Sequence, residues 1–362
     1  MKNKFIIACA GSGKTTKIVK DSLQSSDSIL ITTFTDENCD EIRRKFYKIN
    51  GFIPANVEIL PWFTFELRHL INPFLLPYIN TDIKGINLVS YQSAPYTNQQ
   101  SQNHYLDSNN RIYSDKIALL AYNTIIERKD KIINRLNRLF KKIYIDEFQD
   151  FAGYDLEIVK VLMQNRFTIT LVGDPRQKTY TTHFSRKNKK YENDKEGFIR
   201  NECEKYCEVD STTLNNSYRC PESIITYASK MFPSFAQSHS NSQFTEGDGL
   251  YFVLKQNIST FLQQEQETVQ LRLNSKTCIN NTFKVMTFGK SKGSTYENVL
   301  IYPTKKIKQA FLLNDFKYID SPLTLCKCYV ALTRAKHKVG IVIENNDLSQ
   351  LHNPHITVWD SH

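Results

Sequence analysis

The chain has 362 residues, of which 40% are hydrophobic, so it is long enough for two ordinary domains with sizeable cores. No segment approaches the ~20 consecutive apolar residues of a membrane-spanning helix, which excludes a helical membrane protein. The formal net charge of +10 favours a polyanionic partner such as nucleic acid, although surplus lysine that only keeps a protein in solution would give the same value.

The first elements are a strand and a glycine-rich loop. The apolar run Phe5–Ile7 predicts the strand, and A-C-A-G-S-G-K-T (Ala8–Thr15) predicts a loop that ends where Thr15 opens a helix. Backbone N–H groups of such a loop converge on one point, where the helix N-terminus adds positive potential, so the point suits a phosphate. Lys14 can reach terminal phosphates, and the Thr15 hydroxyl can ligate Mg²⁺. The sequence therefore predicts a nucleoside triphosphate site, and a loop so close to the start of the chain leads us to expect no signal peptide.

Strand-like runs alternate with helical patterns along the first part of the chain. The predicted strands are Lys4–Ala8, Ile29–Thr33, Val57–Leu60, Lys142–Asp146 and Phe167–Gly173. The predicted helices are Glu37–Ile49, Asp115–Phe140 and Asp155–Gln164. This alternation predicts a mostly parallel sheet with helices on both faces. Residues 72–112, rich in Asn, Gln, Tyr and Pro, predict an irregular insertion.

An acidic segment ends the fourth predicted strand. Asp146 and Glu147 open the pentad D-E-F-Q-D, so Asp146 can hold Mg²⁺ through water and Glu147 can polarise the attacking water. The next strand ends in G-D-P-R-Q-K-T-Y (Gly173–Tyr180), where Gln177 can sense the terminal phosphate and Tyr180 can touch the substrate. Because the carboxyl ends of parallel strands carry the chemistry of such sheets, these segments and the phosphate loop predict a nucleoside triphosphatase.

A second set of patterns predicts a second domain. Its strands are Thr212–Leu214, Leu250–Leu254, Phe283–Phe288, Val299–Tyr302 and Val339–Glu344, and its helices are Glu222–Met231 and Leu325–Ala335. We place the boundary near residue 210, which gives a first domain at 1–210, with an insertion at about 72–140, and a second at 211–362. Residues 233–248 are predicted to form a loop.

Seven segments, in this order, make the chain resemble superfamily-one helicases of the UvrD/Rep/PcrA type. They are A-C-A-G-S-G-K-T at 8–15, T-F-T-D-E-N-C-D-E-I at 33–42, D-E-F-Q-D at 146–150, G-D-P-R-Q-K-T-Y at 173–180, L-N-N-S-Y-R at 214–219, V-M-T-F-G-K-S-K-G at 285–293 and Y-V-A-L-T-R-A at 329–335. The resemblance implies an α/β fold of two RecA-like domains, a P-loop NTPase with an ATP site in the interdomain cleft. Large accessory insertions of full-length relatives are missing, so the chain resembles a compact form.

The resemblance also implies roles around ATP and Mg²⁺. Arg219 and Arg334 are expected to act as arginine fingers that neutralise transition-state charge, although either could form a surface salt bridge instead. Tyr218 is expected to stack on the base. The expected catalytic residues are Lys14, Glu147, Gln177, Arg219 and Arg334, and the Mg²⁺ ligands are Thr15 and Asp146. The expected ATP-binding residues are Ala10, Gly11, Ser12, Gly13, Lys14, Thr15, Thr16, Tyr218 and Gly293.

Single-stranded or tailed DNA is the implied nucleic acid. Hydroxyls of Thr33 and Thr287 resemble contacts to backbone phosphates, and Phe34 and Tyr180 resemble aromatics that stack on bases, although Phe34 could be a core residue. The expected DNA contacts are Thr33, Phe34, Trp62, Phe63, Tyr180, Thr287 and Lys290. The basic segment 185–191 either extends the path of the strand or is a solvated face.

Some family features are absent from the sequence. No glutamine motif precedes Phe5, and Thr16 stands where the family often has an arginine against the base, which weakens the case for ATP over other triphosphates. Pro61–Phe65 replaces a histidine-containing segment, so Trp62 or Phe63 either stacks on DNA or belongs to the core.

Eight scattered cysteines, beside a triphosphate site, indicate free thiols in a reducing cytosol, so we expect a cytoplasmic protein. The spacing of Cys203, Cys207 and Cys220 is not that of a zinc knuckle, so we favour ordinary thiols there over a metal.

The sequence thus predicts an ATP hydrolase: a single-strand-DNA-stimulated translocase or helicase that moves 3′–5′ by resemblance. It would work in DNA repair or anti-phage defence with a nuclease partner, for example an OLD/TOPRIM-type subunit. The alternative is a nucleotide-gated DNA-sensing subunit with little unwinding of its own. A small-molecule phosphotransferase is disfavoured because it would not need the motifs of the second domain.

Overall fold

The computed structural model describes residues 3–179, 185–243, 245–275, 277, 279 and 282–360. The chain forms two compact units. The first comprises Met1–Ile6, Lys14–Gly173 and Thr181–Asp210, and the second comprises Ile7–Gly13, Asp174–Tyr180 and Ser211–His362. The first half of the phosphate loop and the segment after Gly173 therefore cluster with the second unit, an arrangement that no local sequence pattern indicates.

The first sheet has six strands in the order β3-β2-β6-β7-β1-β8. They are β1 (Asn3–Ala8), β2 (Ile29–Thr33), β3 (Val57–Pro61), β6 (Lys142–Ile145), β7 (Thr168–Gly173) and β8 (Cys207–Leu214). β2 pairs in parallel with β3 and β6, and β6 pairs in parallel with β7. The predicted parallel sheet is confirmed, but the placement of Thr212–Leu214 in the second set of strands is wrong. These residues end β8, an edge strand of the first sheet, because a strand pattern does not specify the strand's partner.

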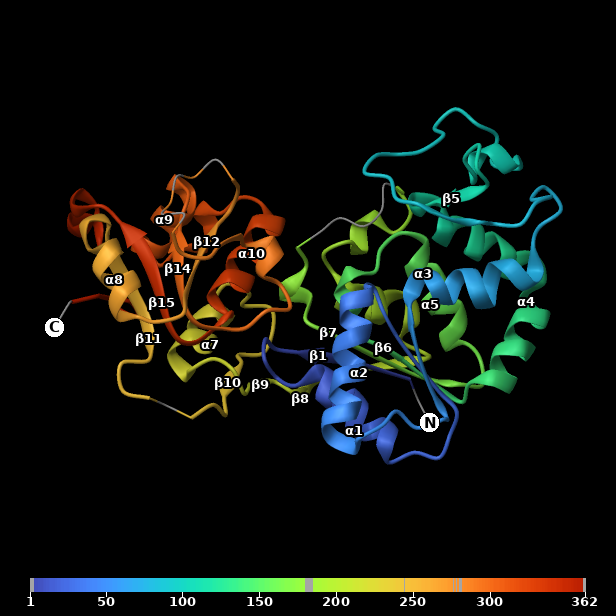
Figure 1. Ribbon diagram of the computed structural model, residues 1–362, viewed down its shortest axis with the longest axis horizontal. Helices are drawn as coiled ribbons and strands as arrows, with labels where there is room; N and C mark the ends of the chain where they lie inside the picture. The colour runs from blue at the N-terminus through green and yellow to red at the C-terminus, as the bar shows by residue number, and fades with distance from the viewer. Residues whose placement is uncertain are drawn as a thin grey trace. The chain divides into compact units, whose positions relative to one another are not determined.

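The helices of the first unit follow its strands (Figure 1). They are α1 (Lys14–Leu23), α2 (Asp36–Asn50), α3 (Trp62–Phe65), α4 (Ile117–Leu139), α5 (Tyr154–Met163) and α6 (Lys195–Phe198). Thr35 starts α2, since its Oγ1 accepts from the N–H of Asn38 at 3.2 Å, and Gly51 ends the helix at φ +80°. The expected irregular segment at 72–112 contains the short strands β4 (Gly85–Asn87) and β5 (Arg111–Tyr113), which are joined in a two-stranded ladder.

The second sheet has six strands in the order β13-β12-β14-β15-β11-β16. They are β11 (Gly249–Leu254), β12 (Thr268–Arg272), β13 (Val285–Thr287), β14 (Tyr296–Tyr302), β15 (Ala335–Ile343) and β16 (Thr357–Val358). Its helices are α7 (Glu222–Ser229), α8 (Ile258–Gln264), α9 (Lys305–Leu313) and α10 (Pro322–Leu332). A two-stranded ladder joins β9 (Asn216–Ser217) to β10 (His239–Ser240).

Sequence patterns missed β12, α8 and α9. β12 carries a buried polar residue at its centre, Gln270, which breaks the apolar run typical of a core strand. The Tyr302 hydroxyl donates to Gln270 Oε1 at 2.6 Å and makes this burial tolerable. Within the described residues, no helix combines the length and apolar content needed to cross a membrane.

Candidate nucleotide and nucleic-acid site

In the first unit, the start of α1 meets the segment that directly follows β6, which brings together Lys14, Thr15, Asp146 and Glu147. Lys14 begins α1, and its Nζ lies 3.4 Å from the Glu147 carboxylate. Thr15 Oγ1 donates to Oδ2 of Asp146, the residue that directly follows β6, at 3.1 Å. We call these four residues the hydrolytic centre. The sequence predicted them separately, and the fold brings them together.

Negative charge is concentrated in this centre. Asp146 is 3% exposed, and burial together with the neighbouring Glu147 raises its pKa to about 7, against the opposing effect of Lys14. Glu147 itself adopts a left-handed backbone at φ +55°, a conformation that few residues other than glycine hold without support. A buried carboxylate beside a hydroxyl is an oxygen donor set that fits Mg²⁺, which would favour the ionised form of Asp146.

The phosphate loop also fits its expected ligand. The Ser12 hydroxyl is buried, and within the described residues it has no hydrogen-bond partner. A buried hydroxyl without a partner is costly, and a phosphate oxygen would satisfy it. Thr16, an expected ATP contact, instead accepts a hydrogen bond from Lys45 Nζ at 3.1 Å.

Residues Ala10 and Gly11 of the loop contact two motifs of the second unit. Gly11 O accepts from the N–H of Tyr218 at 2.9 Å, and a Cβ on Gly11 would lie 2.6 Å from Arg219 Cβ. Gly11 has φ +74°, so glycine is required both by the conformation and by the close approach. The Ala10 N–H donates to Tyr329 Oη at 3.3 Å. Tyr218 is 66% exposed, which leaves its ring accessible to a base.

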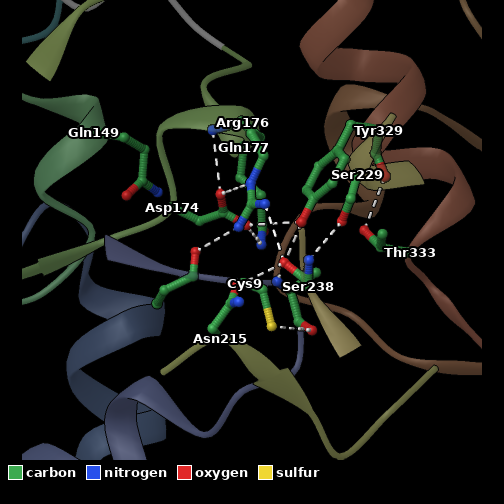
Figure 2. Close-up of polar contacts among 12 residues, drawn as sticks. Cys9, Gln149, Asp174, Arg176, Gln177, Asn215, Ser229, Ser238, Tyr329 and Thr333 are labelled. Carbon is green, nitrogen blue, oxygen red and sulfur yellow. Dashed lines mark hydrogen bonds and ion pairs between the residues drawn. The ribbon is translucent and has the colours of Figure 1, made fainter. Parts of the chain in front are cut away.

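Asp174 accepts hydrogen bonds from three side chains in the second unit, as Figure 2 shows. Arg176 Nε donates to its Oδ1 at 2.8 Å. Gln177 Nε2 and the Tyr329 hydroxyl donate to its Oδ2 at 2.9 and 3.2 Å. Among these four residues, the sequence motifs predicted a role only for Gln177. Asp174, Arg176 and Tyr329 gave no sequence signal of their own, because they contact neighbouring loops rather than a predicted ligand position.

Arg334 and Arg219 lie around this cluster. Arg334 is 1% exposed, and its Nη2 donates to Gln177 Oε1 at 3.2 Å. Arg219 Nη1 donates to the carbonyl of Thr333 at 3.1 Å. The structure therefore brings together Arg334 and Gln177, which the sequence predicted separately as an arginine finger and as a sensor of the terminal phosphate. The surface salt bridge considered for Arg334 is wrong, since its guanidinium is buried.

Arg176 connects the end of β1 to a distant loop of the same unit. Its Nη2 donates to the carbonyl of Ala8 at 2.9 Å, and its Nη1 donates to Ser238 Oγ at 3.1 Å. The guanidinium also lies 5.2 Å from the ring centroid of Tyr329. Ala8 directly precedes the phosphate loop, so this buried cation fixes where the loop begins.

The predicted DNA contacts of the first unit divide into surface and core. Phe34 and Phe63 are half-buried and meet edge to face at 5.4 Å. Trp62 is fully buried, and its indole N–H donates to Asp155 Oδ1 at 2.8 Å. The structure therefore supports the core alternative for Trp62, and we drop it from the proposed contacts. Thr33 is also fully buried, and its Oγ1 accepts from Asn38 Nδ2 at 3.3 Å.

In the second unit, the predicted DNA contacts Thr287 and Lys290 lie at the end of β13 and in the turn that follows it. Thr287 is half-buried, Lys290 is exposed, and the Lys290 N–H donates to Thr287 Oγ1 at 3.4 Å. Gly293 adopts φ +81° with open space around it. Tyr180 lies outside the described residues.

In the basic segment 185–191 of the first unit, Lys187 and Lys190 lie 3.5 and 3.7 Å from the carboxylates of Glu157 and Glu202, respectively.

The fold and these sites define a class of protein. Each of the two six-stranded sheets is built of parallel strands, and the two sheets have the same strand order. In the first sheet, a phosphate loop follows the first strand and an Asp-Glu pair follows β6. This is the architecture of P-loop NTPases with two RecA-like sheets. Residues 80–186 match the UvrD/REP helicase N-terminal domain.

Other comparisons cover different shares of the chain. A curated "Probable DNA helicase II homolog" of Mycoplasma capricolum subsp. capricolum is 25% identical over 149 residues, which are 41% of this chain and 19% of that protein. The structure of an arterivirus nonstructural protein 10 (helicase) aligns at 13% identity and a TM-score of 0.49, and the alignment covers 97% of this chain and 62% of the arterivirus chain. The structure of the PRRSV helicase aligns at 15% identity and a TM-score of 0.45, and the alignment covers 96% of this chain and 54% of the PRRSV chain. The chain thus spans under two thirds of each of these proteins.

Proposed function

We propose that this chain is an ATP-dependent, single-strand-DNA-stimulated translocase or helicase of the UvrD type. The observation that carries the proposal is the hydrolytic centre, in which Lys14 meets Glu147 and Thr15 meets Asp146 within 3.4 Å. The UvrD/REP match at 80–186 supports the choice of a DNA motor among P-loop NTPases. A DNA helicase name on the Mycoplasma relative agrees with it.

Each residue then has a task. Mg²⁺ held by Thr15 and Asp146 would neutralise charge on the β- and γ-phosphates. Glu147 orients the attacking water and takes its proton. Lys14 leaves its ion pair with Glu147 for the terminal phosphates, which frees the carboxylate to act as the base. Gln177, Arg334 and Arg219 stabilise the charge on the γ-phosphate in the transition state.

The test is the rate of ATP hydrolysis with and without single-stranded DNA. Glu147→Gln keeps the shape of the side chain but not its charge, so it should bind ATP·Mg²⁺ and hydrolyse it at least 100-fold more slowly. Lys14→Ala should weaken nucleotide binding and abolish turnover. Arg334→Ala and Arg219→Ala should lower the rate by roughly 10³ with much smaller changes in affinity. Near-normal turnover of Glu147→Gln would remove Glu147 as the base.

A nucleotide-gated DNA sensor is the second candidate. It is favoured by the slender insertion at 72–112, which adds only a two-stranded ladder and short turns where a duplex-gripping domain would be needed. Binding of DNA with no stimulation of hydrolysis would move this candidate to first place. We propose 3′–5′ movement, cytoplasmic location and a nuclease partner in repair or defence on the resemblance alone.

A further inference from the structure

The two sheets share one order of strands, so corresponding strand ends can be compared. Counted along the chain, both sheets have the order third, second, fourth, fifth, first, sixth. β11, β14 and β15 therefore correspond to β1, β6 and β7. In the first sheet, these three strands lead into the phosphate loop, Asp146 and Asp174.

A cavity of about 720 Å³ lies at the same three strand ends of the second sheet. Residues that follow β11, β14 and β15 line it, among them Lys255, Lys305 and Glu344. In open α/β sheets, ligands bind outside the carboxyl ends of the strands. The volume lies in the range of about 300–1,000 Å³ that small-molecule sites occupy. None of its described lining residues belongs to the hydrolytic centre or to the Asp174 cluster.

The rim of this cavity has excess positive charge. Asp347 is engaged, since it accepts from Lys308 Nζ at 2.7 Å and from the N–H of Glu344 at 2.8 Å. Lys255 and Lys305 are exposed, and neither has a carboxylate partner in the described part of the chain. Lys305 is also the first residue of α9, whose N-cap Thr304 makes no side-chain capping bond. The N–H groups of this first turn add to the attraction for an anion.

The inner wall is apolar and partly flat. Ile258, Leu312 and the Tyr302 ring form part of it. A ligand that satisfies both regions combines a negative group with a flat, largely apolar body, as a nucleotide does. The features needed for hydrolysis are missing from the sequence here. After β11, the segment Lys255–Ser259 (K-Q-N-I-S) contains no glycine for close backbone contact with phosphates. After β14, the first residue is Pro303, whereas the corresponding strand β6 is followed by Asp146.

We propose that this cavity is a second nucleotide site that binds without hydrolysis, with Lys255 and Lys305 holding the phosphate. The nucleotide is either free or part of a DNA strand. This proposal does not depend on the proposed motor activity, because it is tested by measuring ligand binding rather than ATP hydrolysis.

The test uses the full chain carrying Lys14→Ala, which weakens the phosphate-loop site. Calorimetric titrations measure the affinity for AMP and for the octanucleotide dT8. Lys255→Gln/Lys305→Gln should weaken binding of at least one probe by about tenfold, which is the loss expected when charge-assisted contacts are removed. Ser259→Trp fills the cavity from its exposed rim and should have the same effect. Lys306→Gln is the matched control, since Lys306 is exposed in the same turn of α9 and pairs with Asp320 outside the cavity.

Weaker AMP binding identifies a free nucleotide as the ligand, and weaker dT8 binding alone identifies a strand. Melting curves that match the Lys14→Ala background show that the variants fold. Photocrosslinking with 8-azido-AMP should label residues 255–259 or 302–312 in the Lys14→Ala chain. Unchanged affinity for both probes in Lys255→Gln/Lys305→Gln, or an equal loss in Lys306→Gln, would overturn the proposal.

Discussion

The side chain of Asp174 connects neighbouring loops of the second unit. It is fully buried and accepts from Arg176, Gln177 and Tyr329. A carboxylate so placed is stable only while its donors remain, because an unpaired buried charge costs several kcal/mol. The positions of Gln177 and of the phosphate loop, through Ala10, therefore depend on residues that touch no ligand.

Tyr329→Phe tests this dependence. The change removes one hydroxyl, and with it the bonds to Asp174 and to the Ala10 N–H. We expect the free energy of unfolding to fall by about 1–3 kcal/mol, because two buried groups lose a partner. The rate of ATP hydrolysis should fall about tenfold, with a smaller change in nucleotide affinity. Tyr227→Phe is the control, since Tyr227 is buried in the same unit and its hydroxyl bonds to Asn353. Equal loss of activity in both variants would contradict a positioning role.

Glu66 predicts a pH dependence of stability. Burial and the neighbouring Asp155 raise the pKa of Glu66 well above its ordinary value of 4.5. The folded protein therefore keeps a proton that the unfolded chain releases, and stability falls as pH rises above about 4.5. Glu66→Gln removes this titration, so its advantage over the parent should grow by up to about 1.4 kcal/mol per pH unit. Urea unfolding between pH 5 and 8 measures the slope, with exposed Glu37→Gln as the control. Parallel slopes for Glu66→Gln and its parent would refute a protonated Glu66.

At the scale of elements, the phosphate loop is shaped by the elements that it contacts as well as by its own sequence. Its first half contacts the segment after β9, where Arg219 lies so close to Gly11 that a Cβ on Gly11 would not fit. Its second half begins α1, which carries Lys14 and Thr15 into the hydrolytic centre.

Gly11→Ala separates the two requirements on this loop. The variant would meet Arg219 Cβ at 2.6 Å in addition to the strain of φ +74°. Gly51→Ala has comparable strain at φ +80° but nothing within 4 Å, so it should cost only about 1 kcal/mol. We expect Gly11→Ala to lose clearly more stability than Gly51→Ala and to weaken nucleotide binding. Thermal unfolding and ATP titration measure both effects. Similar unfolding temperatures for the two variants would show that Arg219 moves aside easily.

At the scale of the whole molecule, the chain is a pair of sheets with few additions. The insertion at 72–112 holds one short ladder and turns. In the families it resembles, large insertions grip the duplex ahead of the motor.

We therefore expect DNA-stimulated ATP hydrolysis but poor unwinding of long duplexes by the isolated monomer. Strand displacement on forked and tailed duplexes at low protein concentration measures this, with hydrolysis followed in parallel. Added salt should weaken single-strand binding steeply, because Lys and Arg side chains displace counterions from the DNA phosphates when the strand binds. Efficient unwinding by a demonstrated monomer would remove the need for a partner such as a nuclease.

The sequence by itself determined the class of fold and most strand positions. Apolar runs located β1, β2, β3, β6, β7, β11, β14 and β15 because buried apolar residues are concentrated in each of these strands. Glycine spacing and acidic strand ends similarly identified Lys14, Thr15, Asp146 and Glu147, since this chemistry is local to a few residues.

Tertiary structure alone decided which distant residues meet. β8 joined the first sheet, and β12 tolerated Gln270, because their partners come from other parts of the chain. Burial placed Trp62 in the core, where Asp155 satisfies its N–H. Arg176 and Tyr329 acquired their roles from hydrogen bonds across 155 to 168 residues of sequence. A local pattern carries no information about such contacts, since each depends on where the folded chain places its partner.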